Sequence, residues 1–290
     1  MSVLIKKFST ASHVVQTEGL GGLKTVLSDK GHALYGRLYA RVARSKWVWK
    51  DHWWVGKIVE MRGDCATLGG CEFGLKSRAI RTSHKSRLFF DFVYEMPERR
   101  ALDHYLNPKL PVVELGASIG VIACLTNKRL SDPQCHIVIE ANPDLVPLLI
   151  QNRDRNGCGF SVLHGAIAYG QEEIRFYQHR DFLCSSVQQP SADYVSVRTL
   201  GLRDVLDIFV YPRITLICDI EGSESDLIEH DLDLISQKVG TFIIEIHEKI
   251  LGEEAVEDLL QKLEDVGMVL LYKKWETYVF ENSNPAPGPS

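Results

Sequence analysis

Four ionisable side chains stand at or near the ends of apolar runs that are typical of buried strands. They are Glu114, Glu140, Asp219 and His247. Because the carboxyl ends of parallel strands meet at one edge of a sheet, we expect these side chains to converge on one crevice. Carboxylates and an imidazole in a crevice can bind hydroxyl groups, accept a proton or hold a cation. Their placement therefore predicts a ligand-binding or catalytic site.

The loop after the first of these runs predicts a close approach by a ligand. Val112–Leu115 is followed by Gly-Ala-Ser-Ile-Gly at 116–120, and Ile119–Leu130 carries apolar residues at helical spacing. Small residues let a ligand reach the backbone, and the free N–H groups of a helix N-terminus favour electron-rich groups. The pattern is neither a phosphate-binding loop ending in Gly-Lys-Ser nor the three-glycine dinucleotide fingerprint. A strand-to-helix turn without a ligand is the alternative.

Glu140 ends the apolar run His136–Glu140, about 20 residues past this loop. Doubly wound folds place at this point the carboxylate that holds the ribose hydroxyls of a nucleotide. Glu140 is therefore the first candidate for cofactor binding, and Ala141 and Asn142 should border the adenine. Glu114 could orient the cofactor's amino group, or it could only brace the loop backbone.

Length and composition predict one catalytic domain with an N-terminal extension. The chain has 290 residues, of which 45% are hydrophobic and 24% charged. We expect an extension at 1–87, a catalytic domain at 88–281 and a disordered tail at 282–290, where prolines recur.

Charge and cysteine content exclude several classes of protein. The net charge of −5 argues against general nucleic-acid binding, and no apolar run is long enough for a membrane span or a signal core. The seven cysteines are odd in number and lack Cys-x-x-Cys spacing, which predicts reduced thiols in a cytoplasmic protein and no zinc site. A homodimer stays open.

Apolar runs of strand length alternate with helical patterns from Leu110 onward, which predicts an α/β fold with a mostly parallel sheet. The expected strands are 112–115, 136–140, 161–164, 174–177, 194–198, 214–219 and 241–247, with a closing hairpin of 268–273 and 277–280. The expected helices are 119–130, 142–157 (capped by Asn142 and ended by Gly157), 202–209, 223–235 (capped by Ser223) and 253–266. Upstream, 66–75 predicts a hairpin, and 88–106 predicts a helix interrupted near Pro97.

Two basic segments precede the catalytic domain. The first places Arg37, Arg41, Arg44, Lys46 and Lys50 beside Trp47, Trp49, Trp53 and Trp54. It could stack on a sugar or base and hold an anionic group, although a helix that packs its tryptophans on the core and leaves its charges solvated is favoured. The second contains Lys76, Arg78, Arg81, His84, Lys85 and Arg87. We predict that both segments contribute to an acceptor pocket for a sugar carrying a phosphate.

Several motifs occur together in an order that resembles the FkbM-type S-adenosylmethionine-dependent methyltransferases, over roughly 110–247. They are Val112-Val-Glu-Leu-Gly-Ala-Ser-Ile-Gly120, Ile139-Glu-Ala-Asn-Pro143, the region 152–156, Ala166-Ile-Ala168, Arg198-Thr-Leu200, Cys218-Asp-Ile-Glu-Gly-Ser-Glu224 and Ile244-Glu-Ile-His247. Two features depart from the family pattern: Glu114 replaces a commoner aspartate, and Gly201-Leu-Arg-Asp204 replaces a paired acid.

The resemblance implies a doubly wound, mostly parallel seven-stranded sheet of the class I methyltransferase, Rossmann-like type. It also implies S-adenosylmethionine as cofactor and, as acceptor, a hydroxyl of a sugar, glycan precursor or polyketide-like molecule. The cofactor-binding residues would be Glu114, Gly116, Ala117, Ser118, Gly120, Glu140, Ala141, Asn142 and Ala166.

His247, Asp219 and Glu221 are the candidate catalytic residues. A hydroxyl ionises too weakly at neutral pH to react without a base, and a histidine with its ordinary pKa near 6.5 suits that task. Asp219 could orient this histidine, or Asp219, Glu221 and His247 could hold a magnesium ion. Glu224 is expected only to favour the N-terminus of the following helix. Ser185 and Ser186 lie in a loop that either crosses the site or is solvated.

Two other classes of function stay open. A nicotinamide-dependent oxidoreductase could use the same crevice, and a non-catalytic binding module could keep the fold and use its Arg/Trp-rich N-terminus to hold a partner. The missing three-glycine fingerprint disfavours the first.

Overall fold

The computed structural model describes residues 52–89, 94–177, 194–209 and 211–286. Two compact units divide the chain, Met1–Lys50 and Asp51–Ser290, and the described residues all belong to the second. The predicted basic segment at 37–50 and the loop of Ser185 and Ser186 lie outside the described residues. None of the helices in these ranges is long and apolar enough to cross a membrane.

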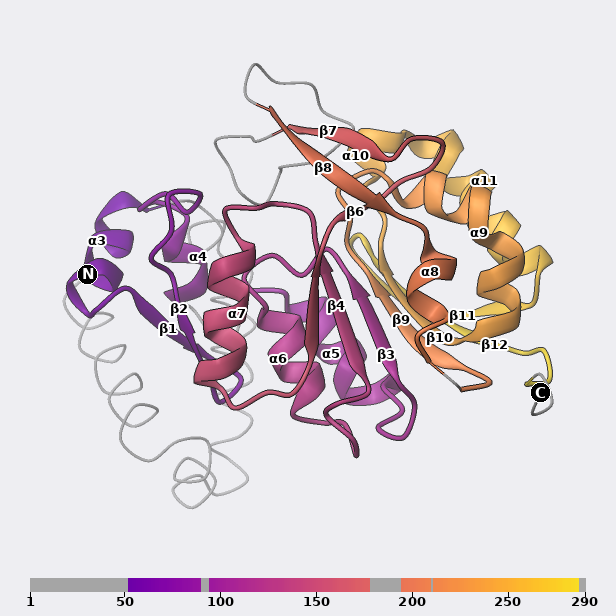
Figure 1. Ribbon diagram of the computed structural model, residues 1–290, viewed down its shortest axis with the longest axis horizontal. Coiled ribbons are helices and arrows are strands. Elements are labelled where there is room, and N and C mark those ends of the chain that lie inside the picture. The colour runs from indigo at the N-terminus through magenta and orange to yellow at the C-terminus, as the bar shows by residue number, and fades with distance from the viewer. Residues whose placement is uncertain (1–51, 90–93, 178–193, 210, 287–290) are drawn as a thin grey trace, which may run out of the picture. The chain divides into compact units, whose positions relative to one another are not determined.

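A seven-stranded sheet forms the centre of this unit (Figure 1). Its strands, in spatial order, are β11 (Met268–Lys274), β12 (Thr277–Asn282), β10 (Val239–Glu245), β9 (Ile214–Cys218), β3 (Val112–Leu115), β4 (His136–Glu140) and β5 (Ser161–His164). Only β12 runs against the other six. The fold class is therefore confirmed as a doubly wound, mostly parallel sheet. The antiparallel β12 between β10 and β11 distinguishes it from the all-parallel dinucleotide-binding order.

Helices cover both faces of the sheet, as its apolar strands require. One face packs against α5 (Met96–Tyr105), α6 (Val121–Asn127) and α7 (Val146–Arg155). The other packs against α8 (Leu202–Leu206), α9 (Glu224–Lys238) and α11 (Glu253–Asp265), while α10 (Glu248–Leu251) leads from β10 to α11. A small sheet of β6 (Ala166–Ile167), β8 (Tyr194–Leu200) and β7 (Glu173–Tyr177) follows β5.

An N-terminal hairpin of β1 (Cys65–Leu68) and β2 (Cys71–Gly74) lies between α3 (Trp53–Met61) and α4 (Lys85–Phe89) in the chain. The predicted turn at Gly69 and Gly70 is confirmed. The fully buried Asn152 of α7 joins this hairpin to the loop after β3: its Oδ1 accepts from the Gly74 N–H at 2.7 Å, and its Nδ2 donates to the Ile119 carbonyl at 2.9 Å. One buried amide thus fixes the hairpin against the glycine loop.

Three expected boundaries were wrong. The interrupted helix predicted at 88–106 is two elements as expected, α4 and α5, but α4 begins at Lys85 and Pro97 lies in the first turn of α5, where proline needs no hydrogen-bond partner. Asn142 does not cap α7, because its side chain accepts from the Asp144 N–H in a preceding turn and the helix begins at Val146. The tail was predicted to start at Asn282, but Asn282 belongs to β12 and donates to the carbonyls of Ser236 and Val239.

The loop after β3 requires glycine at position 116. Gly116 has φ +81°, and a Cβ there would lie 1.7 Å from the Asp219 carbonyl oxygen. The backbones that leave β3 and β9 therefore touch at this point, with no room for a side chain. This contact brings the loop and Asp219 to the same place.

Gly116→Ala should lower the free energy of unfolding by about 3 kcal/mol or more, because it combines left-handed strain with a backbone clash. Gly170→Ala is the matched control, since Gly170 has φ +80° with nothing within 4 Å of the added Cβ. It should cost only about 1–2 kcal/mol. Urea unfolding measures both, and equal losses would contradict the proposed contact.

Candidate active site

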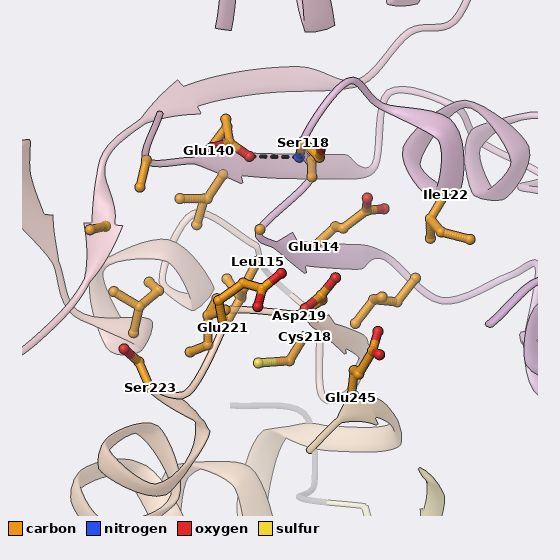
Figure 2. A pocket seen from close by; sticks show the side chains of 18 of the residues that line it. Glu114, Leu115, Ser118, Ile122, Glu140, Cys218, Asp219, Glu221, Ser223 and Glu245 are labelled. Carbon is orange, nitrogen blue, oxygen red and sulfur yellow. Dashed lines mark hydrogen bonds between the residues drawn. The ribbon is translucent and has the colours of Figure 1, made fainter. Parts of the chain in front are cut away.

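A pocket opens at the carboxyl ends of β3, β4, β9 and β10 (Figure 2). It is lined by all of the predicted cofactor-binding residues except Gly120, namely Glu114, Gly116, Ala117, Ser118, Glu140, Ala141, Asn142 and Ala166. Gly120 instead packs near Leu149, which an added Cβ would approach to 2.5 Å. The structure thus brings together residues from four separate strand ends, as expected for a doubly wound sheet.

Glu140 holds the turn of the glycine loop. Its Oε2 accepts from the Ser118 N–H at 2.6 Å, and its Oε1 accepts from the Asn142 N–H at 2.7 Å. Burial raises the pKa of this carboxyl to about 7, although these N–H groups oppose the rise. Figure 2 shows the Glu140 carboxylate and Ser118 together at one end of the pocket. The remaining lone pairs of Glu140 are suited to hydroxyl donors.

Ser118 is a strained residue at the same end. It has φ +51°, which is uncommon for a residue other than glycine. Its Oγ is buried and has no hydrogen-bond partner among the described residues. A ligand in the pocket would supply that partner.

Glu114 is buried beneath the loop and is only 2% exposed. Burial raises its pKa to about 8, partly offset by the Ala123 N–H. Its Oε2 lies 3.6 Å from His136 Nε2, but burial lowers the pKa of His136 to about 3, so both groups are neutral near pH 7. The Oε2 atom has no hydrogen-bond partner in the described structure. The two roles expected for Glu114 both stay predictions.

His247 lies among three carboxylates just beyond β10. Its Nδ1 is 3.0 Å from Glu224 Oε1, and its Nε2 is 3.3 Å from Glu221 Oε2 and 3.6 Å from Asp219 Oδ1. Burial alone would lower the pKa of His247, but the Glu224 hydrogen bond and the other two acids raise it to about 10. The imidazole is therefore protonated near neutral pH. This differs from the expected base with a pKa near 6.5.

Glu224 does more than the expected stabilisation of a helix N-terminus. It is completely buried, and its carboxylate accepts from the backbone N–H groups of Ile220 and Gly222 as well as facing His247. It thereby fixes the turn after β9 that carries Asp219 and Glu221. Ser223 precedes α9 as expected, but its side chain does not cap the helix.

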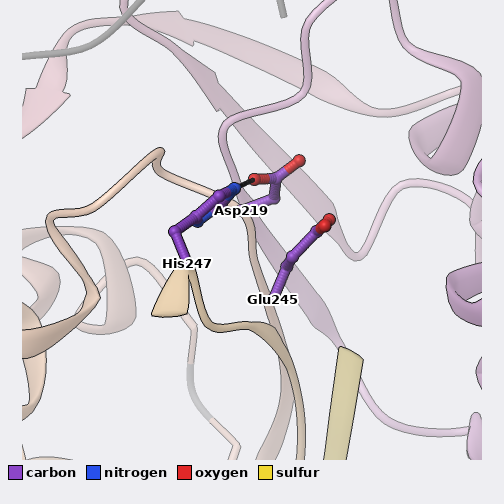
Figure 3. Close-up of side chains that lie close together, drawn as sticks. All are labelled: Asp219, Glu245 and His247. Carbon is purple, nitrogen blue, oxygen red and sulfur yellow. Dashed lines mark ion pairs between the residues drawn. The ribbon is translucent and has the colours of Figure 1, made fainter. Parts of the chain in front are cut away.

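The group of side chains that could hold a cation overlaps only partly with the predicted set. The ligand atoms of Asp219, Glu245 and His247 lie within 4.8 Å of one another (Figure 3), whereas the prediction named Asp219, Glu221 and His247. Burial raises the pKa of the Asp219 carboxyl to about 6, and the charge of His247 opposes that rise. Burial, together with Asp219 and Glu98, raises the pKa of Glu245 to about 10.

Sequence reasoning missed Glu95 and Glu98, which also line the pocket. Neither stands at a strand end, since Glu95 immediately precedes α5 and Glu98 lies in its first turn. Glu245 belongs to the motif Ile244-Glu-Ile-His247, but no role was predicted for it from the sequence. The available signal for a place in the pocket was that Glu245 follows Ile243 by two residues, because residues two apart on a strand lie on the same face of the sheet.

The second basic segment does not line the pocket. Lys85 is 5% exposed and pairs with Asp64 at 2.5 Å and Glu60 at 3.2 Å. The Arg78 side chain is 92% exposed and lies 3.7 Å from Asp144. Lys85 therefore stabilises the N-terminal hairpin region, and these two cations do not form the predicted acceptor pocket. Trp53 and Trp54 are 62% and 52% exposed, so neither packs on the core as favoured.

Glu114→Gln should change the pH dependence of stability. A carboxyl whose pKa rises on folding binds more protons in the native state, so the native protein loses stability as pH rises from the unfolded value towards about 8. From pH 6.5 to 8 this group should cost the wild type roughly 1–2 kcal/mol, and the variant should lack that loss. His136, whose pKa falls from 6.5 to about 3 on folding, is present in both proteins, so its contribution cancels in the comparison. Urea unfolding at both pH values measures the difference, and parallel profiles would refute it.

No family model matches this sequence, and no curated protein matches it. Several solved structures do match it. The precorrin-6y C5,15-methyltransferase from Geobacter metallireducens GS-15 is 12% identical, with a TM-score of 0.40 over 65% of this chain and 88% of that one. A putative O-methyltransferase from Klebsiella pneumoniae is 12% identical, with a TM-score of 0.41 over 67% and 83%.

The methyltransferase FkbM from Methylobacillus flagellatus KT is 16% identical, with a TM-score of 0.39 over 66% of this chain and 60% of that one. Similarity at this level carries no inference about function. The fold class rests on the strand order and the candidate site on its own geometry.

Proposed function

We propose that this chain is an S-adenosylmethionine-dependent methyltransferase that acts on a hydroxyl of a sugar, glycan precursor or polyketide-like small molecule. The observation that carries the proposal is the Glu140 carboxylate at the end of β4, hydrogen-bonded to the N–H of Ser118 in the glycine loop after β3. Acid and loop together form one end of a pocket in a sheet whose antiparallel β12 is absent from dinucleotide-binding domains.

The residues present suit this cofactor. Glu140 would take the ribose hydroxyls, Ala141, Asn142 and Ala166 would border the adenine, and the backbone of 116–118 would face the amino-acid part. The buried Ser118 Oγ, which has no hydrogen-bond partner among the described residues, supports a ligand that touches the loop. When bound, S-adenosylmethionine supplies a methyl group on a positively charged sulfur.

The chain's own task is to position the acceptor and to remove its proton. Much of the acceleration of such a transfer comes from holding the reacting atoms in line and close together. Asp219, with a pKa near 6, is ionised at neutral pH and can take the acceptor's proton. The protonated His247 lowers the pKa of Asp219 and so keeps it ionised. We therefore assign His247 a positioning and electrostatic role.

A divalent cation stays a prediction. Asp219, Glu245 and His247 would hold it, and the Glu224 hydrogen bond to Nδ1 is the kind of contact that orients a metal-binding histidine. Such an ion would acidify the acceptor hydroxyl. The protonated imidazole explains the same geometry without an ion.

Glu140→Ala should weaken S-adenosylmethionine binding by ~10–100-fold, because it removes the hydroxyl acceptor and the partner of the Ser118 N–H. Turnover at saturating cofactor should fall much less. Glu254→Ala, on the exposed face of α11, is the matched control. Calorimetric titration measures the affinity, and an unchanged affinity would remove Glu140 from the cofactor site.

His247→Gln separates the two roles considered for His247. If His247 keeps Asp219 ionised, the acid limb of kcat/KM against pH should move up by roughly one unit, with activity recovered at higher pH. If His247 is the base, activity should drop ~10²–10⁴-fold at every pH. Cofactor affinity, measured beside it, should stay within a few-fold of wild type.

A further inference from the structure

The pocket carries far more acid than the cofactor can use. Its described lining contains seven carboxylates, Glu95, Glu98, Glu114, Glu140, Asp219, Glu221 and Glu245, and within that described lining no lysine, arginine or histidine. Glu140 is assigned to the ribose and Asp219 to the proton. Four of the others, Glu95, Glu98, Glu114 and Glu245, form what we call the acidic wall.

The acidic wall lies between the sheet and the N-terminus of α5. Glu114, Ile217 and Ile243 are side by side across β3, β9 and β10, and Glu245 follows two residues after Ile243 on the same face. Glu98 lies in the first turn of α5 and Glu95 immediately precedes this helix, which packs against β10 and β12. Figure 2 shows Glu245 and Glu140 at opposite ends of the pocket with Asp219 between them.

Several acids of this wall lie near enough for their charges to act on one another. Burial is the largest cause of the raised pKa of Glu95, followed by the charges of Glu98 and Asp219 and, more weakly, Glu114. Acids this close repel one another when ionised, so the wall is compensated only by protons or by a cation.

The wall also contains buried oxygens without partners. Glu114 Oε2, on a side chain only 2% exposed, and Glu95 Oε2 both lack a hydrogen-bond partner among the described residues. Glu95 has φ +47° and so holds its side chain there at a backbone cost. Glu98 is partly satisfied by the Thr277 hydroxyl.

A purely structural role explains only some of the acids in the wall. The N-terminus of α5 favours an acid in its first turn, which accounts for Glu98. It does not account for Glu114 and Glu245, which come from strands, or for the buried unpartnered oxygens of Glu95 and Glu114, two residues that line the pocket. Donors with positive charge are what this arrangement lacks.

We propose that the acceptor carries a protonated amine and that Glu95, Glu98, Glu114 and Glu245 bind it beside the methyl-transfer site. The acceptor is then a hydroxylated amine, such as an amino sugar or a phenolic amine, and not the phosphorylated sugar expected from the basic segments. An ammonium offers three donors to the oxygens of the wall. Ile122, Ile217 and Ile243 line the same pocket and suit the apolar stem of such a molecule. This inference rests on the proposed function.

The test uses matched probes that differ in charge: tyramine, N-acetyltyramine and 4-hydroxyphenylacetate, and glucosamine, N-acetylglucosamine and glucose 6-phosphate. Binding to the full chain saturated with S-adenosylhomocysteine is measured by calorimetry, and methyl transfer from labelled S-adenosylmethionine is measured beside it. The cationic member should bind at least ~10-fold more tightly than the neutral member in one series or both, and the anionic member most weakly. No preference for the cation in either series overturns the proposal.

Glu98→Gln and Glu95→Gln should each reduce the preference for the cationic probe over its N-acetyl partner by ~10-fold, with S-adenosylhomocysteine affinity unchanged. Glu254→Gln on α11 should leave the preference intact. A preference that survives both wall variants overturns the assignment, and so does amine binding that appears only when magnesium or manganese is added. Failure to bind S-adenosylhomocysteine at all would instead defeat the proposed function.

Discussion

The contact between the backbones that leave β3 and β9 is the constraint on which the site depends. Gly116 meets the Asp219 carbonyl, and the two strands are tied there because the Asp219 N–H donates to the Leu115 carbonyl at 2.9 Å. On the other side, the Gly116 N–H donates to the Ile139 carbonyl at 2.9 Å, next to Glu140. The ends of β3, β4 and β9 therefore meet at Gly116. This contact helps to bring Glu140 and Asp219 into one pocket.

Charge is distributed unequally along that pocket. At the loop end, Glu140 is satisfied by two backbone N–H groups, and beyond β10 the buried Glu224 and its partners enclose a protonated His247. The described lining of the pocket contains no lysine, arginine or histidine beside the acidic wall, although the protonated His247 lies close to Glu245. Stability at neutral pH therefore depends on protons held by buried carboxyls, and binding a cation would replace them.

The sheet and its glycine loop were predictable because short-range signals specify them. Apolar runs bounded by Glu114, Glu140 and Asp219 mark the strands, and strand polarity alone brings their ends together. The protonation state of His247 was not predictable, because it depends on Glu224, 23 residues earlier, turning its carboxylate onto Nδ1. Lys85 was predicted to face a ligand because its partners could not be identified from the sequence. Glu60 and Asp64 become its neighbours only in the folded chain. Glu95 and Glu98 carried no strand-end signal, so their place in the pocket emerged only from the packing of α5.

The central claim is that this pocket holds an adenosyl cofactor between Glu140 and Asp219. Calorimetric titration of the purified chain with S-adenosylhomocysteine, and separately with NAD⁺, tests it most directly. We predict saturable one-site binding of S-adenosylhomocysteine and no heat of binding from NAD⁺. Binding of NAD⁺ without binding of S-adenosylhomocysteine would contradict the account and assign the crevice to a nicotinamide-dependent oxidoreductase.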